Sequence, residues 1–429
     1  MLLVHTKKVT PRISYIFKHI CSRILGIEVS FTTTLEGFVA HSGPKISYGK
    51  VPLGNELFFQ SYGLLEQQGV ESIEVYVKKW EETYGFFEVS SASALRFDIF
   101  SMSFFLLSRY EEYLPHVKDE LGRFMASESL AFKNDFLHQP VVDIAAYRFK
   151  AKLMEAFPGI SFSEKTMIVH PVIEATEAFA FKYKGLVRTV FNYASDFFKG
   201  KFRNIILRSQ VLLGLRRDPF DSFKWLISVG KHSNFHMTVF FLLGEAREFR
   251  KGINSQRKGF IELIKYVADY QEVGLVFSFE ALTEYELLKQ EKLRMESITN
   301  RHADSSLNAE YVVALPDNYR SLVELEVNRD FTMVYDNEPG FRAGTCTPFL
   351  FYDLDYEVKT PLLIHPVAFS TASLKNSNPE EVGKLTDRLL LEVAKVAGTF
   401  TIIFSNRDFA VSSDPVWRKL FTEKLEAYV

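Results

Sequence analysis

The pattern of hydrophobic and polar side chains differs between the N-terminal third of this chain and the rest. The N-terminal third mixes segments typical of strands with segments typical of helices. Residues 2–4 form a short apolar run and residues 28–33 alternate, which is typical of strands. Residues 11–25 carry apolar side chains every three or four positions, which predicts a helix.

A second helix is predicted over residues 98–113. Its apolar positions repeat at helical spacing, so Arg109 and Glu112 are expected on the solvent face. Together these segments predict an N-terminal mixed α/β domain over residues 1–150.

From about residue 160, short apolar runs alternate with helical patterns. Strands are expected at residues 166–169, 238–243, 273–279 and 399–404. The clearest helix is residues 379–397, which Asn378 can cap and Gly398 can end. Strands that alternate with helices predict a parallel sheet or barrel over residues 151–429. Functional side chains in such folds gather at the C-terminal ends of the strands.

Composition narrows the class of protein. The chain has 429 residues, of which 47% are hydrophobic and 24% charged, and its net charge is −2. These values predict folded domains and give no overall charge that favours nucleic acid. The two cysteines, Cys21 and Cys346, lie too far apart in sequence to indicate a disulfide framework. We expect neither a signal peptide nor a transmembrane segment, and hence a cytoplasmic protein.

One segment departs from this balance, because residues 182–217 are rich in lysine and arginine. The pattern is typical of a solvated helical face. The alternative is a surface that contacts anionic glycans or lipid head groups.

Several short motifs occur in a fixed order. They are SRYEEY at 108–113, DELGRF at 119–124, PVVD at 140–143, FKYKG at 181–185, DPFD at 218–221, FFLLG at 240–244, GFRAG at 340–344 and FYDL at 351–354. The first three resemble the N-terminal domain that is fused to deacetylase-like domains in Bacteroidetes-type bacteria. The later motifs are similar to those of the polysaccharide deacetylase family (carbohydrate esterase family four).

This resemblance implies a distorted (β/α)7 barrel that follows the N-terminal domain. Active members of the family bind a divalent metal, usually zinc, through one Asp and two His. A second Asp acts as the base, a His as the acid, and an Arg orients the base. The metal polarises the acetyl carbonyl and acidifies a bound water.

Counting from the motifs places other residue types at these positions. Glu174 and Thr176 occupy the two Asp positions, Val276 and Ala309 the two His ligand positions, and Ser405 the position of the acid. A hydroxyl, an isopropyl and a methyl group do not provide the ligands of a zinc site. The resemblance therefore implies degenerate metal-ligand positions and no metal cofactor.

Glu174 and Arg342 are the residual candidates for catalysis, and the resemblance implies that they pair across the barrel mouth. Such a pair is either a structural remnant or a residual acid–base or binding group. The expected pocket residues are His170, Phe277, Phe279, Tyr335 and Asp353. His232 and His236 have the spacing of a metal-binding pair, but they precede a strand one unit too early, so we interpret them as ordinary loop and helix-end histidines.

Three functions stay open. The first is an inactive deacetylase-like module that binds a glycan, such as an acetylated amino sugar, or a protein partner. The second is an active carbohydrate deacetylase, a hydrolase of C–N bonds other than peptide bonds, in which Glu174 works with His170 or another nearby histidine. The third is a structural scaffold whose barrel mouth is plugged by Phe side chains.

Overall fold

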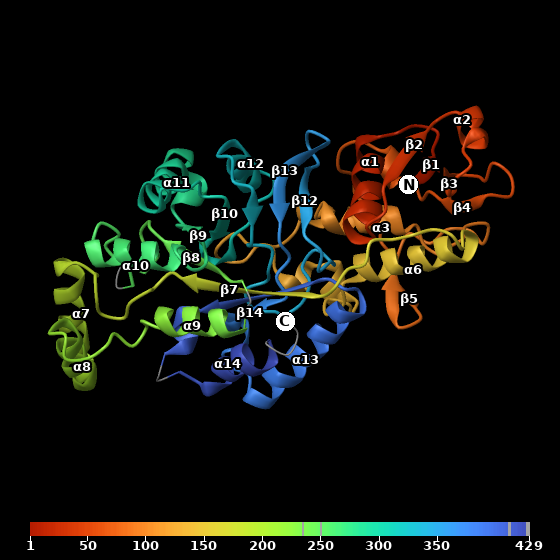
Figure 1. Cartoon of the computed structure of the whole chain (residues 1–429). Coiled ribbons are helices and arrows are strands. Elements are labelled where there is room, and N and C mark those ends of the chain that lie inside the picture. Colours follow the sequence, from red (N-terminus) through yellow and green to blue (C-terminus); the bar gives the residue numbers. More distant parts are fainter. Residues whose placement is uncertain (234–235, 249–250, 411–412, 426–429) are drawn as a thin grey trace. The chain divides into compact units, whose positions relative to one another are not determined.

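The computed structural model describes residues 1–233, 236–248, 251–410 and 413–425. It is a mixed α/β structure with parallel sheets, which divides into two compact units (Figure 1). The first unit comprises residues 1–167, 339–368 and 386–399, and the second comprises residues 168–338, 369–385 and 400–429. The boundary predicted at residue 150 falls inside a helix, α6, and the first unit also takes two segments from the C-terminal half of the chain.

The first unit is built around a four-stranded sheet in the order β2-β1-β3-β4, whose strands pair in parallel. Its elements are β1 (Leu2–His5), α1 (Pro11–Lys18), the π-helical η1 (His19–Ile24), β2 (Val29–Thr32), α2 (Leu35–Ala40), β3 (Lys45–Gly49), β4 (Leu57–Gln60), β5 (Lys78–Trp80), β6 (Thr83–Gly85), α3 (Ile99–Leu107), α4 (Tyr110–Tyr113), α5 (Leu130–Lys133), α6 (Val141–Ala156), β12 (Phe349–Asp353) and β13 (Val358–Ile364). The predicted strands at 2–4 and 28–33 and the helix at 11–25 are confirmed.

The helix predicted over residues 98–113 is interrupted. α3 ends at Leu107, and Arg109 adopts a left-handed conformation with φ of 53° before α4 begins. This break turns the chain, so that the side chains of Arg109 and Glu112 are buried. The prediction that both face solvent was wrong, because it assumed one continuous helix.

The strands of the second unit lie in the order β11-β10-β9-β8-β7-β15-β14. Its elements are β7 (Ile168–Ala175), α7 (Leu186–Phe198), α8 (Phe202–Leu212), α9 (Phe223–Ser233), β8 (Thr238–Leu242), α10 (Lys258–Ala268), β9 (Glu272–Phe277), α11 (Tyr285–Thr299), β10 (Ser305–Asn308), α12 (Asp317–Glu324), β11 (Arg329–Asp330), β14 (Phe369–Ser370), β15 (Thr399–Ser405) and α14 (Pro415–Lys419). The helix α13 (Pro379–Lys395) is shared by the two units. The strands predicted at 238–243, 273–279 and 399–404 are confirmed within one or two residues.

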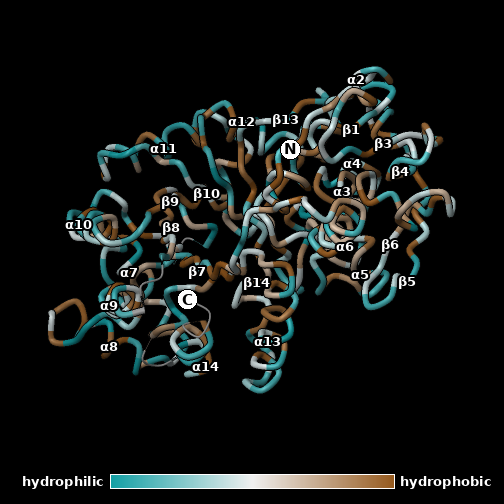
Figure 2. The backbone as a smooth tube through the Cα atoms, turned by 45° about the vertical axis from the view of Figure 1, so that its right-hand side comes forward, coloured by the Kyte–Doolittle hydropathy of each residue, from teal (hydrophilic) through white to brown (hydrophobic). Residues whose placement is uncertain are grey.

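Strand β7 begins and ends later than predicted. The strand was predicted at residues 166–169, but it begins at Ile168 and continues through Pro171 to Ala175. Its register pairs Glu174 with Phe240 of β8, and Phe240 with Gly274 of β9. Glu174 therefore lies at the C-terminal end of a buried parallel strand. The tubes of β7, β8 and β9 are largely brown or pale in Figure 2, in keeping with their buried apolar side chains.

Candidate functional site

A cavity of about 530 Å³ opens in the second unit where the strands end. Glu174 and Thr176 enter it from the end of β7, Leu242 from the end of β8, and Arg407 from the turn after β15. The short segment after β10 adds Ala309, Glu310 and Tyr311. Parallel α/β folds gather their functional groups at the C-terminal ends of the strands, and this cavity lies there. We call it the strand-end cavity.

The strand ends beside this cavity carry apolar side chains. In the strand register, Leu242 pairs with Val276, and Val276 with Leu307. Partners in parallel strands point to the same face of the sheet, and residues two apart along a strand share that face. Leu242, Val276 and Leu307 therefore lie on the face that carries Glu174, one step further toward the strand ends. Val276 and Leu307 are fully buried, while Leu242 contacts the cavity.

Glu174 and Tyr311 form the central polar contact. The Tyr311 hydroxyl donates to Glu174 Oε2 at 2.6 Å. Burial raises the pKa of the Glu174 carboxyl, an effect that the Tyr311 hydrogen bond and the charge of Arg407 oppose. Burial and the neighbouring carboxylate hold the pKa of Tyr311 well above its usual range. The Glu174 carboxyl therefore stays protonated to a higher pH than that of an exposed glutamate. The Tyr311 hydroxyl stays protonated and remains a hydrogen-bond donor.

Charged groups surround this pair. Glu177 accepts from the buried Lys184 Nζ at 2.7 Å, and its other oxygen lies 3.6 Å from Arg407 NH1. Asp336, Glu245, Glu248, Arg247, Lys251 and Lys375 also line the cavity. Hydroxyl-rich ligands suit such a lining, because it presents donors and acceptors side by side.

Ser405, at the predicted acid position, is engaged in local structure. Its Oγ accepts from the backbone N–H of Arg407 and from Arg407 Nε at 3.1 Å, and its own N–H donates to Asp408 Oδ2 at 2.8 Å. These contacts cap the helical turn after β15. Ser405 therefore positions Arg407, which is a cavity residue that the sequence alone did not indicate.

The residues present do not fit the divalent metal that the family resemblance implies. Thr176 and Ala309 both line the cavity, and the buried Val276 pairs in register with Leu242, which lines it too, so the three positions gather at one end of the sheet. Their side chains offer one neutral hydroxyl and no nitrogen or carboxylate donor. Over the described residues, no group of three or more His, Cys, Asp or Glu side chains is placed to hold a metal ion.

His170 lies away from this cavity, contrary to expectation. It stands four residues before Glu174 on β7, and four residues of extended strand span about 13 Å. Its Nε2 lies 3.0 Å from Thr238 Oγ1 at the start of β8, and its ring packs edge-on against Phe331. Burial lowers its pKa to about 4. The prediction assumed that the strand ends near His170, whereas the strand continues to Ala175.

The aromatic side chains expected in the pocket lie outside it. Phe277 and Tyr335 are buried in the core of the second unit. Phe279 is partly buried beneath Arg247, whose Cζ lies 5.7 Å from the ring centroid. No phenylalanine occurs among the described residues that line the cavity, which does not agree with the plugged mouth of the scaffold hypothesis.

Arg342 binds a different carboxylate from the one predicted. Within the first unit, its Nε and NH2 donate to Glu112 at 3.0 and 2.8 Å, and Arg109 Nε donates to the same carboxylate at 2.8 Å. All three side chains are buried. Arg342 of the GFRAG motif therefore forms a structural ion pair, because the break after α3 places Glu112 next to it.

Asp353 also serves the first unit. It is buried at the end of β12, and its Oδ1 accepts from the backbone N–H groups of Asp355 and Tyr356 at 3.0 and 3.2 Å. It therefore shapes the turn between β12 and β13 and does not line the strand-end cavity.

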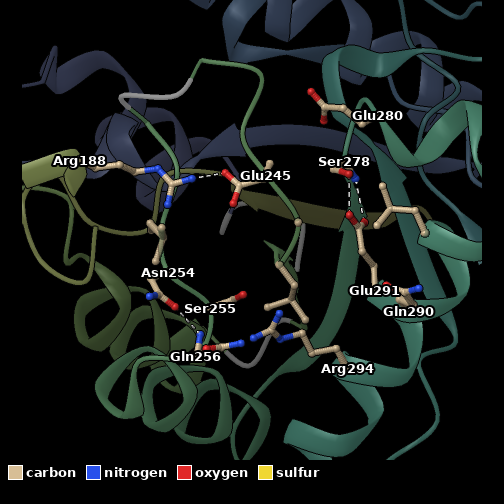
Figure 3. A pocket seen from close by; sticks show the side chains of 14 residues that line it. Arg188, Glu245, Asn254, Ser255, Gln256, Ser278, Glu280, Gln290, Glu291 and Arg294 are labelled. Carbon is tan, nitrogen blue, oxygen red and sulfur yellow. Dashed lines mark hydrogen bonds and ion pairs between the residues drawn. The ribbon is translucent and has the colours of Figure 1, made fainter. Parts of the chain in front are cut away.

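A second cavity, of about 510 Å³, shares Glu245 with the first (Figure 3). The buried Glu291 of α11 accepts from both the hydroxyl and the N–H of Ser278. Gly244 is required beside them, because a Cβ there would lie 1.9 Å from Glu291 Oε1. Sequence reasoning missed Glu291, since its helix reads as an ordinary charged surface helix.

Comparisons with known proteins give a family for only part of the chain. Residues 2–158 match a family of unknown function, DUF7033. No curated protein matches the chain.

Solved structures with some similarity cover about three fifths of it. One is a protein assigned as a polysaccharide deacetylase from Mycobacterium smegmatis, at 13% identity and a TM-score of 0.41, over 62% of this chain and 86% of that one. Another is a CE4 family pseudoenzyme from Bacillus anthracis, at 11% identity and a TM-score of 0.30, over 61% of each chain. A third is a 4-alpha-glucanotransferase from Thermococcus litoralis, at 13% identity and a TM-score of 0.35, over 60% of this chain and 36% of that one.

Proposed function

We propose that this protein is a polysaccharide deacetylase-like module that binds a glycan in the strand-end cavity and does not use a metal. The observation that carries the proposal is the lining of that cavity. A rim of carboxylates and cations surrounds the Glu174–Tyr311 pair, while Thr176, Ala309 and the buried Val276 stand where metal ligands are expected.

The strand order supports a distorted (β/α)7 barrel. β7, β8, β9, β10 and β11 follow one another in space as in sequence, and β15 and β14 continue on the other side of β7. Each of the pairs β7–β8, β8–β9, β9–β10, β10–β11 and β14–β15 is parallel. A parallel barrel has its strands in such a succession, which is why we favour one here.

The chemistry of the cavity favours an acetylated amino sugar. Sugar hydroxyls both donate and accept, so they suit Glu174, Asp336 and the amide of Asn337. The methyl group of an acetamide suits the apolar side chains of Leu242 and Ala309, which line the cavity.

The proposal is tested by calorimetric titration with oligomers of N-acetylglucosamine and, for comparison, of unacetylated glucosamine. We expect binding that prefers the acetylated oligomer. Glu174→Gln should weaken it by roughly tenfold, because a charge-assisted acceptor is lost. Glu380→Gln, on the exposed start of α13, is the matched control and should bind as the wild type does. Absence of binding to any oligomer would contradict the proposal.

A metal-free hydrolase is the second candidate, and the 2.6 Å contact between Tyr311 and Glu174 favours it. Glu174 would take a proton from water as that water adds to the acetyl carbonyl, and Tyr311 would donate a hydrogen bond to the carbonyl oxygen. The C–N bond would then break as Glu174 returns the proton to the departing amine nitrogen, which leaves acetate. The measurement is acetate release from acetylated oligomers in the presence of a chelator. Release that Glu174→Gln abolishes would establish hydrolysis in place of simple binding.

A further inference from the structure

The helical hairpin of α7 and α8 carries its large apolar side chains on the outside. The exposed members of the set are Leu186, Val187, Val190, Phe191, Phe197, Phe198, Phe202, Ile206, Leu212, Leu213 and Leu215. Phe198 is 85% exposed and Leu213 75%. Single exposed apolar side chains are ordinary on protein surfaces, but a contiguous set marks a contact surface.

The side chains between these two helices are polar. Arg208 NH2 binds Asp196 Oδ2 at 2.7 Å, and both residues are buried. The guanidinium of Arg208 also lies over the ring of Tyr193, whose hydroxyl is 2.8 Å from Ser209 Oγ. The hairpin thus buries Asn192, Asp196 and Arg208 together with one apolar residue, Val211, and exposes most of its large apolar side chains. A helix pair that faces water normally exposes its polar side chains instead.

The exposed apolar residues follow helical spacing. Leu186, Val190 and Phe197 are four and then seven residues apart on α7, and Phe202, Ile206 and Leu213 repeat the same spacing along and just beyond α8. Residues at such intervals share one face of a helix. Each helix therefore presents an apolar stripe, and Phe197 packs against both Phe198 and Phe202 at the turn between them.

Positive charge flanks the stripes. Lys199, Lys201 and Arg203 lie at the turn between the helices, and Arg216 and Arg217 follow the end of α8; all five are exposed. Within residues 186–217 the only acidic residue is Asp196, which Arg208 already neutralises. Apolar stripes bordered by cations match a surface of acyl chains beneath anionic head groups.

A cavity of about 920 Å³ lies beside α8 and continues this pattern. Arg203, Arg216, Arg217 and Arg418 line it together with the apolar Ile206 and Leu207. Asp218 and Asp221 also line it, so the four arginines outnumber the carboxylates, and the carboxylate of Asp218 is occupied by the backbone N–H groups of residues 180–182. Guanidinium groups are suited to bind phosphate.

We propose that the α7–α8 hairpin lies in the plane of an anionic phospholipid membrane, with its phenylalanines and leucines among the acyl chains and its lysines and arginines at the phosphates. The arginine-lined cavity then receives a lipid phosphate. In the described part of the chain, no helix has the length and apolar character of a membrane span.

Flotation of the full chain with vesicles tests this. The vesicles are phosphatidylcholine alone and phosphatidylcholine with roughly a third phosphatidylglycerol. We expect at least about tenfold tighter binding to the anionic vesicles, which weakens in high salt. The triple variants Phe197→Ser/Phe198→Ser/Phe202→Ser and Lys199→Glu/Lys201→Glu/Arg203→Glu should each lower it by about tenfold or more.

Matched controls are Leu35→Ser/Val39→Ser and Lys7→Glu/Lys8→Glu, which change exposed residues of the same kinds elsewhere. Circular dichroism and thermal unfolding verify that every variant folds. Equal affinity for neutral and anionic vesicles, or wild-type binding by the hairpin variants, would overturn the proposal. So would a dimer in solution that the phenylalanine variant converts to a monomer, because the stripes would then cover a second copy of this chain.

Discussion

The carboxyl group of Glu174 is held between an apolar strand end and a ring of charged groups. Burial favours its protonated form, whereas Tyr311 and Arg407 favour the carboxylate, and the outcome is a raised pKa. At the residue scale, this means that the folded protein binds the Glu174 proton more tightly than the unfolded chain does.

This difference predicts how Glu174→Gln changes stability with pH. Below the pKa of the unfolded chain, about 4.3, the carboxyl is protonated in both states and the variant should resemble the wild type. As the pH rises through the raised folded pKa, the wild type loses stability that the neutral amide retains. Denaturant unfolding from about pH 4 to about pH 8 should therefore show that the free energy of unfolding of the variant increases relative to that of the wild type. A difference that stays constant over this range would show that Glu174 is not perturbed in the folded state.

Glu112 illustrates the opposite balance. Burial by itself would raise its pKa, but the charges of Arg342 and Arg109 lower it to about 2. Its stabilising contribution is therefore present above the unfolded pKa and is lost as the pH falls toward about 2.

Glu112→Gln should lower the free energy of unfolding by about 3–5 kcal/mol near neutral pH, because two buried guanidinium groups lose their carboxylate. The loss should shrink between about pH 5 and pH 2 as the wild-type glutamate itself becomes protonated. Guanidinium denaturation followed by circular dichroism measures it. Glu380→Gln serves again as the surface control, and an equal effect of the two substitutions would argue against the buried network.

At the scale of single elements, the apolar pattern predicted six of the strands and three of the helices, but it did not predict where a helix is interrupted or where a strand ends. The cap of α13 was identified from Asn378, whose Oδ1 accepts from Glu381 N at 2.9 Å, because capping depends on neighbouring residues only. Arg109 at the helix break binds the backbone oxygen of Arg342, and β7 beyond Pro171 pairs with β8, so both features involve partners distant in sequence. Local patterns carry no information about such partners, so the burial of Glu112 and the placement of His170 were missed.

The same limit applies to the candidate site. Motif counting placed Glu174, Thr176 and Ala309 in one region, and the structure brings all three to one cavity. Arg407 and Tyr311 were missed, because their roles arise from a helical turn after β15 and from a segment of left-handed backbone after β10. Neither feature has a signature in the spacing of apolar residues.

Strand β9 gives a prediction at this scale. Gly274 faces Phe240, and a Cβ at Gly274 would lie 2.3 Å from a ring carbon. Gly274→Ala should therefore destabilise the protein by about 1–3 kcal/mol through overpacking. Gly159→Ala is the control, because no atom lies within 4 Å of the place that its Cβ would take and its backbone is not left-handed. We expect Gly159→Ala to be neutral or slightly stabilising in thermal unfolding, and equal effects of both substitutions would contradict the tight contact.

At the scale of the whole molecule, the chain does not divide at a single point. The first unit is made from residues 1–167 together with residues 339–368 and 386–399. The returning segment supplies buried partners to the N-terminal part. Asp143 accepts from Thr345 and Thr347 hydroxyls at 2.6 and 2.5 Å, Tyr15 donates to Leu350 O at 2.8 Å, and Glu112 binds Arg342.

The region that matches DUF7033, residues 2–158, therefore lacks part of the unit that it belongs to. Expressed alone, this fragment would expose the apolar faces of Phe104 and Tyr15 that Tyr352 covers, and it would leave Glu112 and Asp143 without their partners from the returning segment. Glu112 would keep Arg109 but lose Arg342, and Asp143 would lose the donors that bind it from the returning segment. The loss of partners from buried carboxylates costs several kcal/mol, which is comparable with the whole stability of a domain. We expect the fragment to unfold without a cooperative transition and to bind the dye ANS, and we expect a fragment in which residues 339–368 are joined to it by a flexible linker to regain part of the transition. Cooperative unfolding of residues 2–158 alone, at the temperature of the full chain, would show that the returning segment is dispensable.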